Sequence, residues 1–294
     1  MRMIVLAVFA AFCFVSPAAW AERLPRAVIA DPAPDAQHPA GMEPLHIPSG
    51  GPNDRVEING VIYTASGKGP HPTFVLFHGL PGNEKNLDLA QAVRRAGWNV
   101  VTINYRGSWG SPGAFRFAHT LEDARATLAF VRDPANAAKY RIDPARIAVG
   151  GHSMGGWVTA HTLAGDGALL GGVMISAGDI GRATGLARTD RATALGFMNA
   201  SRETLNTSGE AMVDELIATR ADWTLPSLAP ALKTRRALVL YSDDFVKADS
   251  ENFITALRAG GATQLQVRHA ATDHSWSDKR LTLQAMVINW LATL

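Results

Sequence analysis

Short apolar runs alternate with amphipathic segments along most of the chain. The apolar runs are typical of buried strands and lie at 73–77, 100–103, 147–149, 172–175, 238–240 and 265–267. Apolar residues at helical spacing lie at 87–94, 121–131, 154–163, 253–259 and 281–291. This alternation predicts an α/β fold, in which a mostly parallel central sheet is flanked by helices. Ligands of such sheets bind at the carboxyl ends of the strands, so we expect the chemistry there.

Two stretches depart from the alternation. Residues 22–53 are rich in Pro, Ala and Gly and show no sustained period, which predicts an extended arm or linker. Residues 178–233 carry mixed helical pieces without a clear strand, which predicts a helical insertion or lid. The remaining segment, 54–294, is then one domain, and it opens at 56–63 with a strand or with a hairpin that turns near Asn59-Gly60.

The first 21 residues have the three parts of a secretory signal. Arg2 gives a positive start, an apolar run of thirteen residues follows, and Ala19-Trp20-Ala21 places small residues before a cleavage point. The run is shorter than the roughly 20 residues that span a bilayer, so we expect cleavage after Ala21 rather than stable membrane anchoring. The mature protein would be periplasmic or secreted. It would contain no cysteine, because Cys13 is the only one in the chain.

Composition and charge exclude several classes of protein. A hydrophobic content of 47% is that of a globular chain, and a formal net charge of +2 offers no strong field for nucleic acid. One cysteine cannot build a disulfide framework or a multi-cysteine zinc site, and no paired metal ligands stand at a useful spacing. Any covalent catalysis must therefore use a nucleophile other than a thiol.

The strongest motif is Gly151-His152-Ser153-Met154-Gly155, a G-x-S-x-G pattern. It follows the predicted strand at 147–149 and precedes a helical segment, which is the context that a nucleophile elbow requires. The flanking glycines allow a tight turn from which the hydroxyl of Ser153 projects. The bare pattern also arises by accident, so the strand before it is what makes Ser153 the candidate nucleophile.

A serine nucleophile needs a base and an acid that orients the base. Asp243 and Asp244 directly follow the predicted strand at 238–240. We favour Asp244 as the acid, because Phe245-Val246 resembles the residues that follow the acid in related enzymes. His274 follows the last predicted strand and is the candidate base, whereas His269 lies at the end of that strand. We interpret His152 and His161 as packing or site-wall residues.

The segment Phe77-His78-Gly79-Leu80-Pro81-Gly82 follows another buried strand. The backbone N–H groups of Leu80 and Met154 are the predicted oxyanion hole, which stabilises negative charge that develops on a carbonyl oxygen. His78 could be catalytic, but we favour a structural role in which it holds this loop.

These motifs together resemble those of the α/β-hydrolases. The H-G-x-P-G loop, the G-x-S-x-G turn, the late aspartate and Asp273-His274-Ser275 match that pattern, and 104–111 resembles a turn of the esterase, dienelactone-hydrolase-like and prolyl-oligopeptidase-like branches. Ser242 is a departure, because a glycine is common there, and it makes Asp244 the least secure member. The resemblance implies a serine hydrolase of the Ser153, Asp244 and His274 type, with no metal or organic cofactor.

The substrate that this resemblance implies is a small-molecule carboxylic ester. Peptidases of the fold often carry an N-terminal propeller for which this chain has no room, which favours esters. A peptidase or amidase and a lipase remain alternatives, although the charged residues of 178–233 argue against a large lipid-facing lid. A non-catalytic binding module is less favoured, because candidates for the whole triad are present. No motif suggests nucleic acid as a partner, and the sequence does not reveal the oligomeric state.

Overall fold

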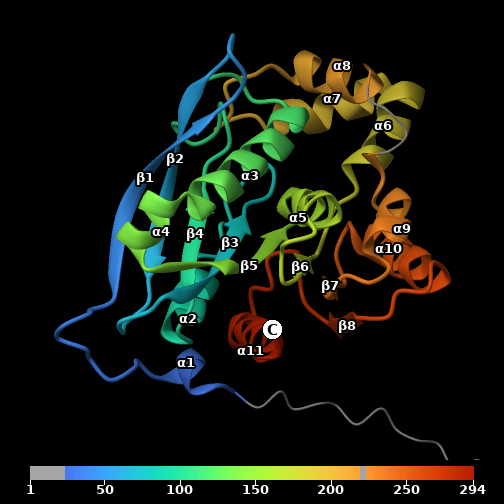
Figure 1. Cartoon of the computed structure of the whole chain (residues 1–294). Coiled ribbons are helices and arrows are strands. Elements are labelled where there is room, and N and C mark those ends of the chain that lie inside the picture. Colours follow the sequence, from blue (N-terminus) through green and yellow to red (C-terminus); the bar gives the residue numbers. More distant parts are fainter. Residues whose placement is uncertain (1–23, 219–222) are drawn as a thin grey trace, which may run out of the picture.

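The computed structural model describes residues 24–218 and 223–294, and an eight-stranded sheet runs through its centre (Figure 1). The strand order is β1-β2-β4-β3-β5-β6-β7-β8. β1 and β2 are antiparallel to their neighbours, and the other strands pair in parallel. The strands are β1 (Gly41–Ser49), β2 (Val56–Thr64), β3 (His71–Phe77), β4 (Asn99–Ile103), β5 (Ile142–His152), β6 (Gly172–Ile175), β7 (Ala237–Ser242) and β8 (Leu265–Ala270). The α/β class that the sequence predicted is confirmed.

Helices cover both faces of the sheet and enclose two apolar cores. One core lies between the sheet and α2 and α11, and the other lies between the opposite face and α3, α5 and α10. The helices are α1 (Arg26–Ile29), α2 (Leu87–Arg95), α3 (Phe117–Arg132), α4 (Pro134–Tyr140), α5 (Met154–Gly165), α6 (Ile180–Thr189), α7 (Arg191–Ala200), α8 (Gly209–Ala218), the 3₁₀ helix η2 (Leu225–Leu228), α9 (Ala229–Leu232), α10 (Lys247–Ala259) and α11 (Arg280–Leu291). The central parallel strands are buried on both sides, which explains why they read as continuous apolar runs.

The N-terminal part of the sheet corrects two predictions. Residues 41–49, which were predicted as part of an extended arm, form β1 and pair along their whole length with β2. Leu45 and Ile47 point into the core, while Pro44 and Pro48 are tolerated because β1 lies at the edge of the sheet. The alternative of a hairpin near Asn59-Gly60 is wrong, because β2 runs straight through both residues. Gly60 is required there by close packing rather than by a turn, since a Cβ would lie 2.9 Å from the carbonyl oxygen of Thr102.

The segment 178–233 leaves the sheet between β6 and β7 and carries the helices α6, α7, α8, η2 and α9. α6, α7 and α8 pack on one another and form a group at one end of the molecule, far from α11 in Figure 1. The loop after β4 contacts the connection between α7 and α8, because the N–H of Trp109 donates to the carbonyl of Thr204 (3.0 Å). That this segment moves as a lid stays a prediction.

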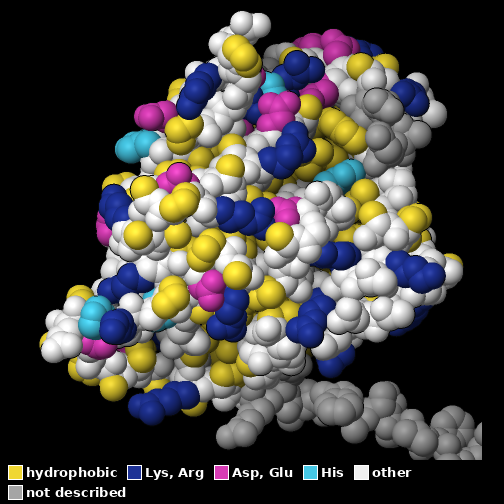
Figure 2. Space-filling view, in the orientation of Figure 1, with side chains coloured by type: hydrophobic (Ala, Val, Ile, Leu, Met, Phe, Trp, Pro, Cys, Tyr) yellow, Lys and Arg dark blue, Asp and Glu magenta, His cyan; other side chains and the backbone are white. Residues whose placement is uncertain are grey.

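The proposed signal at 1–21, with Cys13, lies outside the described residues. In the part of the chain that the structure describes, no helix is both long and apolar enough to cross a bilayer. Figure 2 shows Lys and Arg side chains scattered over one face with acidic side chains among them. This distribution agrees with the nearly neutral charge of the chain.

Candidate active site

Ser153 lies on the tight turn between β5 and α5. Its φ of 58° and ψ of −121° are unusual for a residue with a side chain and mark local backbone strain. The turn closes because its glycines lack a Cβ: one on Gly155 would lie 2.2 Å from the carbonyl oxygen of Phe77, and one on Gly151 would lie 2.1 Å from that of Gly155. Ser153 is half-buried at this turn. Its hydroxyl therefore projects at the carboxyl end of a central strand.

Asp244 and His274 meet at the carboxyl ends of β7 and β8. His274 Nδ1 lies 2.7 Å from Asp244 Oδ2, and the backbone N–H of Val246 donates to Oδ1 (2.9 Å). Although burial opposes it, the hydrogen bond with His274 and one from Ser242 hold the pKa of Asp244 below its usual value. A buried carboxylate that is ionised and bonded to Nδ1 fixes the tautomer of His274 and leaves Nε2 for chemistry.

The adjacent carboxylate makes different contacts. Asp243 is exposed, and its Oδ1 accepts from Lys247 Nζ (2.7 Å) and lies 3.0 Å from His269 Nε2. His269 belongs to β8 and packs its ring on Tyr241 rather than on the Asp244–His274 pair. The structure thus separates the two aspartates and the two histidines that the sequence left as alternatives.

A chain of hydrogen bonds that the sequence did not indicate supports Asp244. Ser242 donates to Asp244 Oδ2 (2.8 Å), Ser176 donates to Ser242 (2.8 Å), and Trp276 Nε1 donates to Ser176 (3.1 Å). The middle direction follows because Ser242 has one proton and a carboxylate can only accept it. All three supporting side chains are buried. Ser242, which departs from the family pattern, therefore stabilises the ionised carboxylate, and its place at the end of β7 was the available signal.

His152 connects the serine turn with the loop of His274. Its Nε2–H donates to the backbone carbonyl of His274 (2.7 Å), and the two rings are 4.5 Å apart between centroids. Within the described residues, no hydrogen bond joins the hydroxyl of Ser153 to the ring of His274. In serine hydrolases the hydrogen bond between the serine hydroxyl and the histidine ring often forms only when substrate binds. The contact of His152 with His274 places the ring of His274 beside the serine turn.

The loop after β3 lies against Ser153. A Cβ on Gly79 would lie 2.9 Å from the Ser153 Cβ, so this position must be glycine for the loop to approach. Leu80, Ser153 and Met154 line a common cavity. Met154 is the first residue of α5, where a backbone N–H has no partner inside the helix and is available to an oxyanion.

The turn 105–109 donates hydrogen bonds to the loop after β3. Trp109 Nε1 donates to the carbonyl of Pro81 (2.7 Å), and the hydroxyl of Tyr105 donates to the carbonyl of His78 (3.3 Å). His78 is buried, and its Nδ1 bonds to the carbonyl of Gly79 (2.8 Å). These contacts support a structural role for His78. Tyr105 and Trp109 thus hold the loop after β3, a role that the motif at 104–111 did not indicate.

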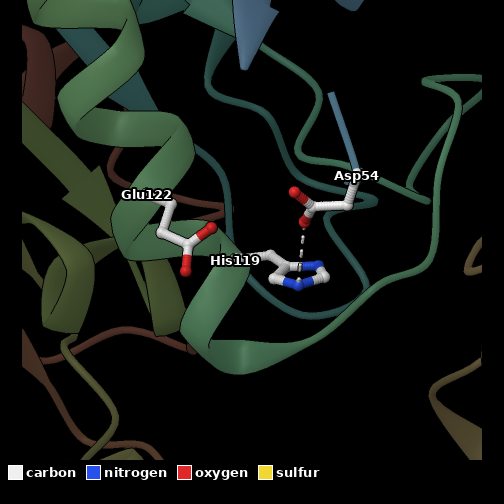
Figure 3. A group of neighbouring side chains, drawn as sticks. All are labelled: Asp54, His119 and Glu122. Carbon is white, nitrogen blue, oxygen red and sulfur yellow. Dashed lines mark ion pairs between the residues drawn. The ribbon is translucent and has the colours of Figure 1, made fainter. Parts of the chain in front are cut away.

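The structure also brings together three side chains of metal-ligating type, although the sequence showed no such spacing. Asp54, from the loop between β1 and β2, points at the ring of His119, and Glu122 lies on the same helix, α3 (Figure 3). The guanidinium of buried Arg106 bonds to Asp54 (2.7 Å) and to Glu122. The positive charge beside these carboxylates thus comes from Arg106, and the cluster stabilises the loop after β4.

The two buried histidines predict how stability depends on pH. Burial lowers the pKa of His78 to about 4 and that of His152 to about 4, so the native state keeps both neutral while the unfolded chain protonates them near 6.5. The free energy of unfolding should therefore fall as the pH drops from 6.5 to 4, by up to about 3 kcal/mol for each histidine. Urea unfolding between these pH values measures this slope.

A pair of variants tests the assignment of that slope. His152→Gln should make the decline shallower, whereas His46→Gln, at an exposed position of β1, should leave it as in the wild type. Equal slopes in all three proteins would contradict the prediction.

Comparison with known proteins places the chain in a family. The model of the Alpha/beta hydrolase family matches residues 74–282, which is most of the chain, and the chain therefore belongs to that family. This membership supports hydrolase activity. A comparison with curated proteins finds no match.

Solved structures share the fold at low sequence identity. An esterase of Pyrobaculum calidifontis is 19% identical, with 88% of this chain and 87% of that chain covered and a TM-score of 0.62. An esterase of Rhizomucor miehei is also 19% identical, with 88% and 84% covered and a TM-score of 0.62. An acylaminoacyl peptidase of Pyrococcus horikoshii is 17% identical, with a TM-score of 0.64. The aligned region is 86% of this chain but only 41% of the peptidase.

Proposed function

We propose that the protein is a serine hydrolase that cleaves carboxylic esters of small molecules. The observation that carries this proposal is the hydrogen-bonded Asp244–His274 pair, held by His152 against the strained turn of Ser153. Ser153, His274 and Asp244 lie at the carboxyl ends of three strands, as nucleophile, base and acid. Acyl transfer needs this arrangement.

In the proposed reaction, His274 Nε2 takes the proton of Ser153 as Oγ attacks the ester carbonyl carbon. The carbonyl oxygen becomes an oxyanion, which the N–H groups of Leu80 and Met154 stabilise. Asp244 stabilises the positive charge on His274, which then gives its proton to the leaving alcohol. Water, activated in turn by His274, attacks the acyl-enzyme and releases the carboxylic acid and free Ser153.

An ester fits this site better than a peptide. A peptide substrate needs hydrogen-bonding groups for its own backbone, because buried polar groups without partners are costly. The cavity beside Ser153, of about 260 Å³, is lined mostly by apolar side chains. The structural likeness to the peptidase of P. horikoshii concerns the fold alone.

A fluorophosphonate probe tests the proposal, because it reacts with a serine that an adjacent base activates. We expect the native protein to be labelled, with the probe mapped by peptide sequencing to Ser153, and heat-denatured protein to stay unlabelled. Native protein should also hydrolyse p-nitrophenyl butanoate faster than a panel of peptide anilides. Labelling at another residue, or none in the native protein, would overturn the mechanism.

A further inference from the structure

The cavity beside Ser153 is built mainly by the segment 178–233. Ser153, Leu80 and Met154 line it from outside that segment. Its walls come from α6, α7 and α8, which contribute Ile180, Ala183, Ala194, Met198 and Leu216. Side chains from three helices thus converge on the nucleophile, and apart from Arg182 all of them are apolar.

The charged residues at this cavity are already partnered. Arg182 and Asp249 form an ion pair, with Arg182 Nη2 donating to Asp249 Oδ2 (3.0 Å). The carboxylate of Asp179 accepts from the backbone N–H groups of Arg182 and Leu225, each at 3.1 Å. A charged substrate group that entered the cavity would lose its water without gaining a free counter-ion, which is unfavourable. An uncharged apolar group gains free energy by the same transfer.

Three large apolar side chains are exposed around the same cavity. Leu186, Phe197 and Phe245 are 44, 52 and 68% exposed, and all three line it. Single exposed apolar residues are ordinary, but a group of them around one opening marks a site that receives apolar ligands. The exposed side of the cavity is therefore largely apolar.

The position of His274 indicates which half of an ester enters. His274 must protonate the leaving alcohol, so the alcohol lies on the side of its ring. The cavity is lined by the two oxyanion residues and by Phe245, which packs on His274 (4.5 Å between ring centroids), but not by His274 itself. The acyl chain, which stays on Ser153 after the alcohol leaves, is thus directed into the cavity.

We propose that the cavity between α6, α7 and α8 binds the acyl chain of the substrate, and that the substrates are esters of uncharged, medium-length aliphatic acids. This inference rests on the proposed function. A volume of about 260 Å³ is just below the usual range for small-molecule pockets, which suits a chain of intermediate length better than a long fatty acyl chain.

The test varies the acyl and the alcohol chains separately. With p-nitrophenyl esters, kcat/KM should peak between butanoate and octanoate and be about 10-fold lower for acetate and for palmitate, because each buried methylene adds binding free energy until the cavity is full. With alkyl acetates in a pH-stat, lengthening the alcohol from ethyl to octyl should change kcat/KM by less than about threefold, since this chain stays outside the cavity.

Cavity-filling variants locate the effect. Ala194→Phe fills the cavity from α7 and should lower kcat/KM for octanoate about 10-fold while acetate changes less than about twofold. Ala183→Phe, at a half-buried position of α6, should do the same and covers the case in which buried Ala194 does not tolerate phenylalanine. Ala192→Phe, on the exposed face of α7, is the matched control and should leave the whole series unchanged.

The outcomes separate the two proposals. A peak that follows alcohol length, or equal loss for acetate and octanoate in the filled variants, would overturn the acyl assignment in a protein that still takes the fluorophosphonate at Ser153. No hydrolysis of any ester together with no labelling of Ser153 would overturn the proposed function and the acyl assignment with it.

Discussion

Ser153→Ala is expected to lower kcat/KM for p-nitrophenyl butanoate by about 10⁴- to 10⁶-fold. The reason is that the oxygen which forms the acyl-enzyme is lost, while the oxyanion N–H groups and the cavity remain. Only the weak catalysis that they give to direct attack by water is left. The Michaelis constant, where it can be measured, should change much less than kcat. Initial rates at pH 7.5, with the variant purified away from any wild-type protein, measure this.

A second serine provides the control for that experiment. Ser250 is fully buried on α10, and its hydroxyl has no hydrogen-bond partner among the described residues. Ser250→Ala should therefore keep wild-type activity, because it removes the same group, a serine hydroxyl, without the loss of a hydrogen bond. Circular dichroism and thermal unfolding should show that both variants fold. If folded Ser153→Ala kept activity near the wild-type level, the assignment of Ser153 as the nucleophile would be wrong.

The parallel part of the fold was predictable because of its burial. The strands β3, β5 and β6 have helices on both faces, so the residues of their buried central parts are mostly apolar and the sequence shows a short apolar run in each. The glycines around Ser153 were informative for the opposite reason, because close backbone contacts forbid any side chain there. Both signals are local, which is why one sequence was enough to find them.

The features that the sequence did not reveal depend on contacts between distant segments. Residues 41–49 were predicted to be part of an arm because 22–53 is rich in Pro, Ala and Gly and shows no sustained period. Only the pairing of β1 with β2 makes Leu45 and Ile47 core residues. The support of Asp244 joins Ser176, Ser242 and Trp276 across 100 residues of sequence. No period or motif encodes such a network, because each member is an ordinary strand or loop residue on its own.

The two adjacent aspartates also show where local patterns reach their limit. The residues that follow Asp244 favoured it as the acid. Which aspartate contacts His274, however, depends on how the backbone turns after β7. The structure turns Asp244 to the ring of His274 and leaves Asp243 in solvent with Lys247. A serine at position 242 donates a hydrogen bond to this carboxylate, which a glycine side chain could not do.

Replacing each of the two aspartates by asparagine, one at a time, tests this arrangement. Asp244→Asn should lower kcat by about 10⁴-fold. An amide has about the same size, but it cannot stabilise the positive charge on His274, and its NH₂ group favours the tautomer that places the proton on Nε2. The same rates with p-nitrophenyl butanoate measure the loss, and slow labelling by the fluorophosphonate should accompany it.

Asp243→Asn is the matched control, because it makes the same chemical change one residue away. It removes the exposed ion pair with Lys247 and the contact with His269, so kcat should stay within about twofold and stability should change little. The two variants differ only in which carboxylate meets His274. A large loss of kcat in Asp243→Asn with little loss in Asp244→Asn would reverse the assignment, and equal small losses would show that neither carboxylate supports His274 in catalysis.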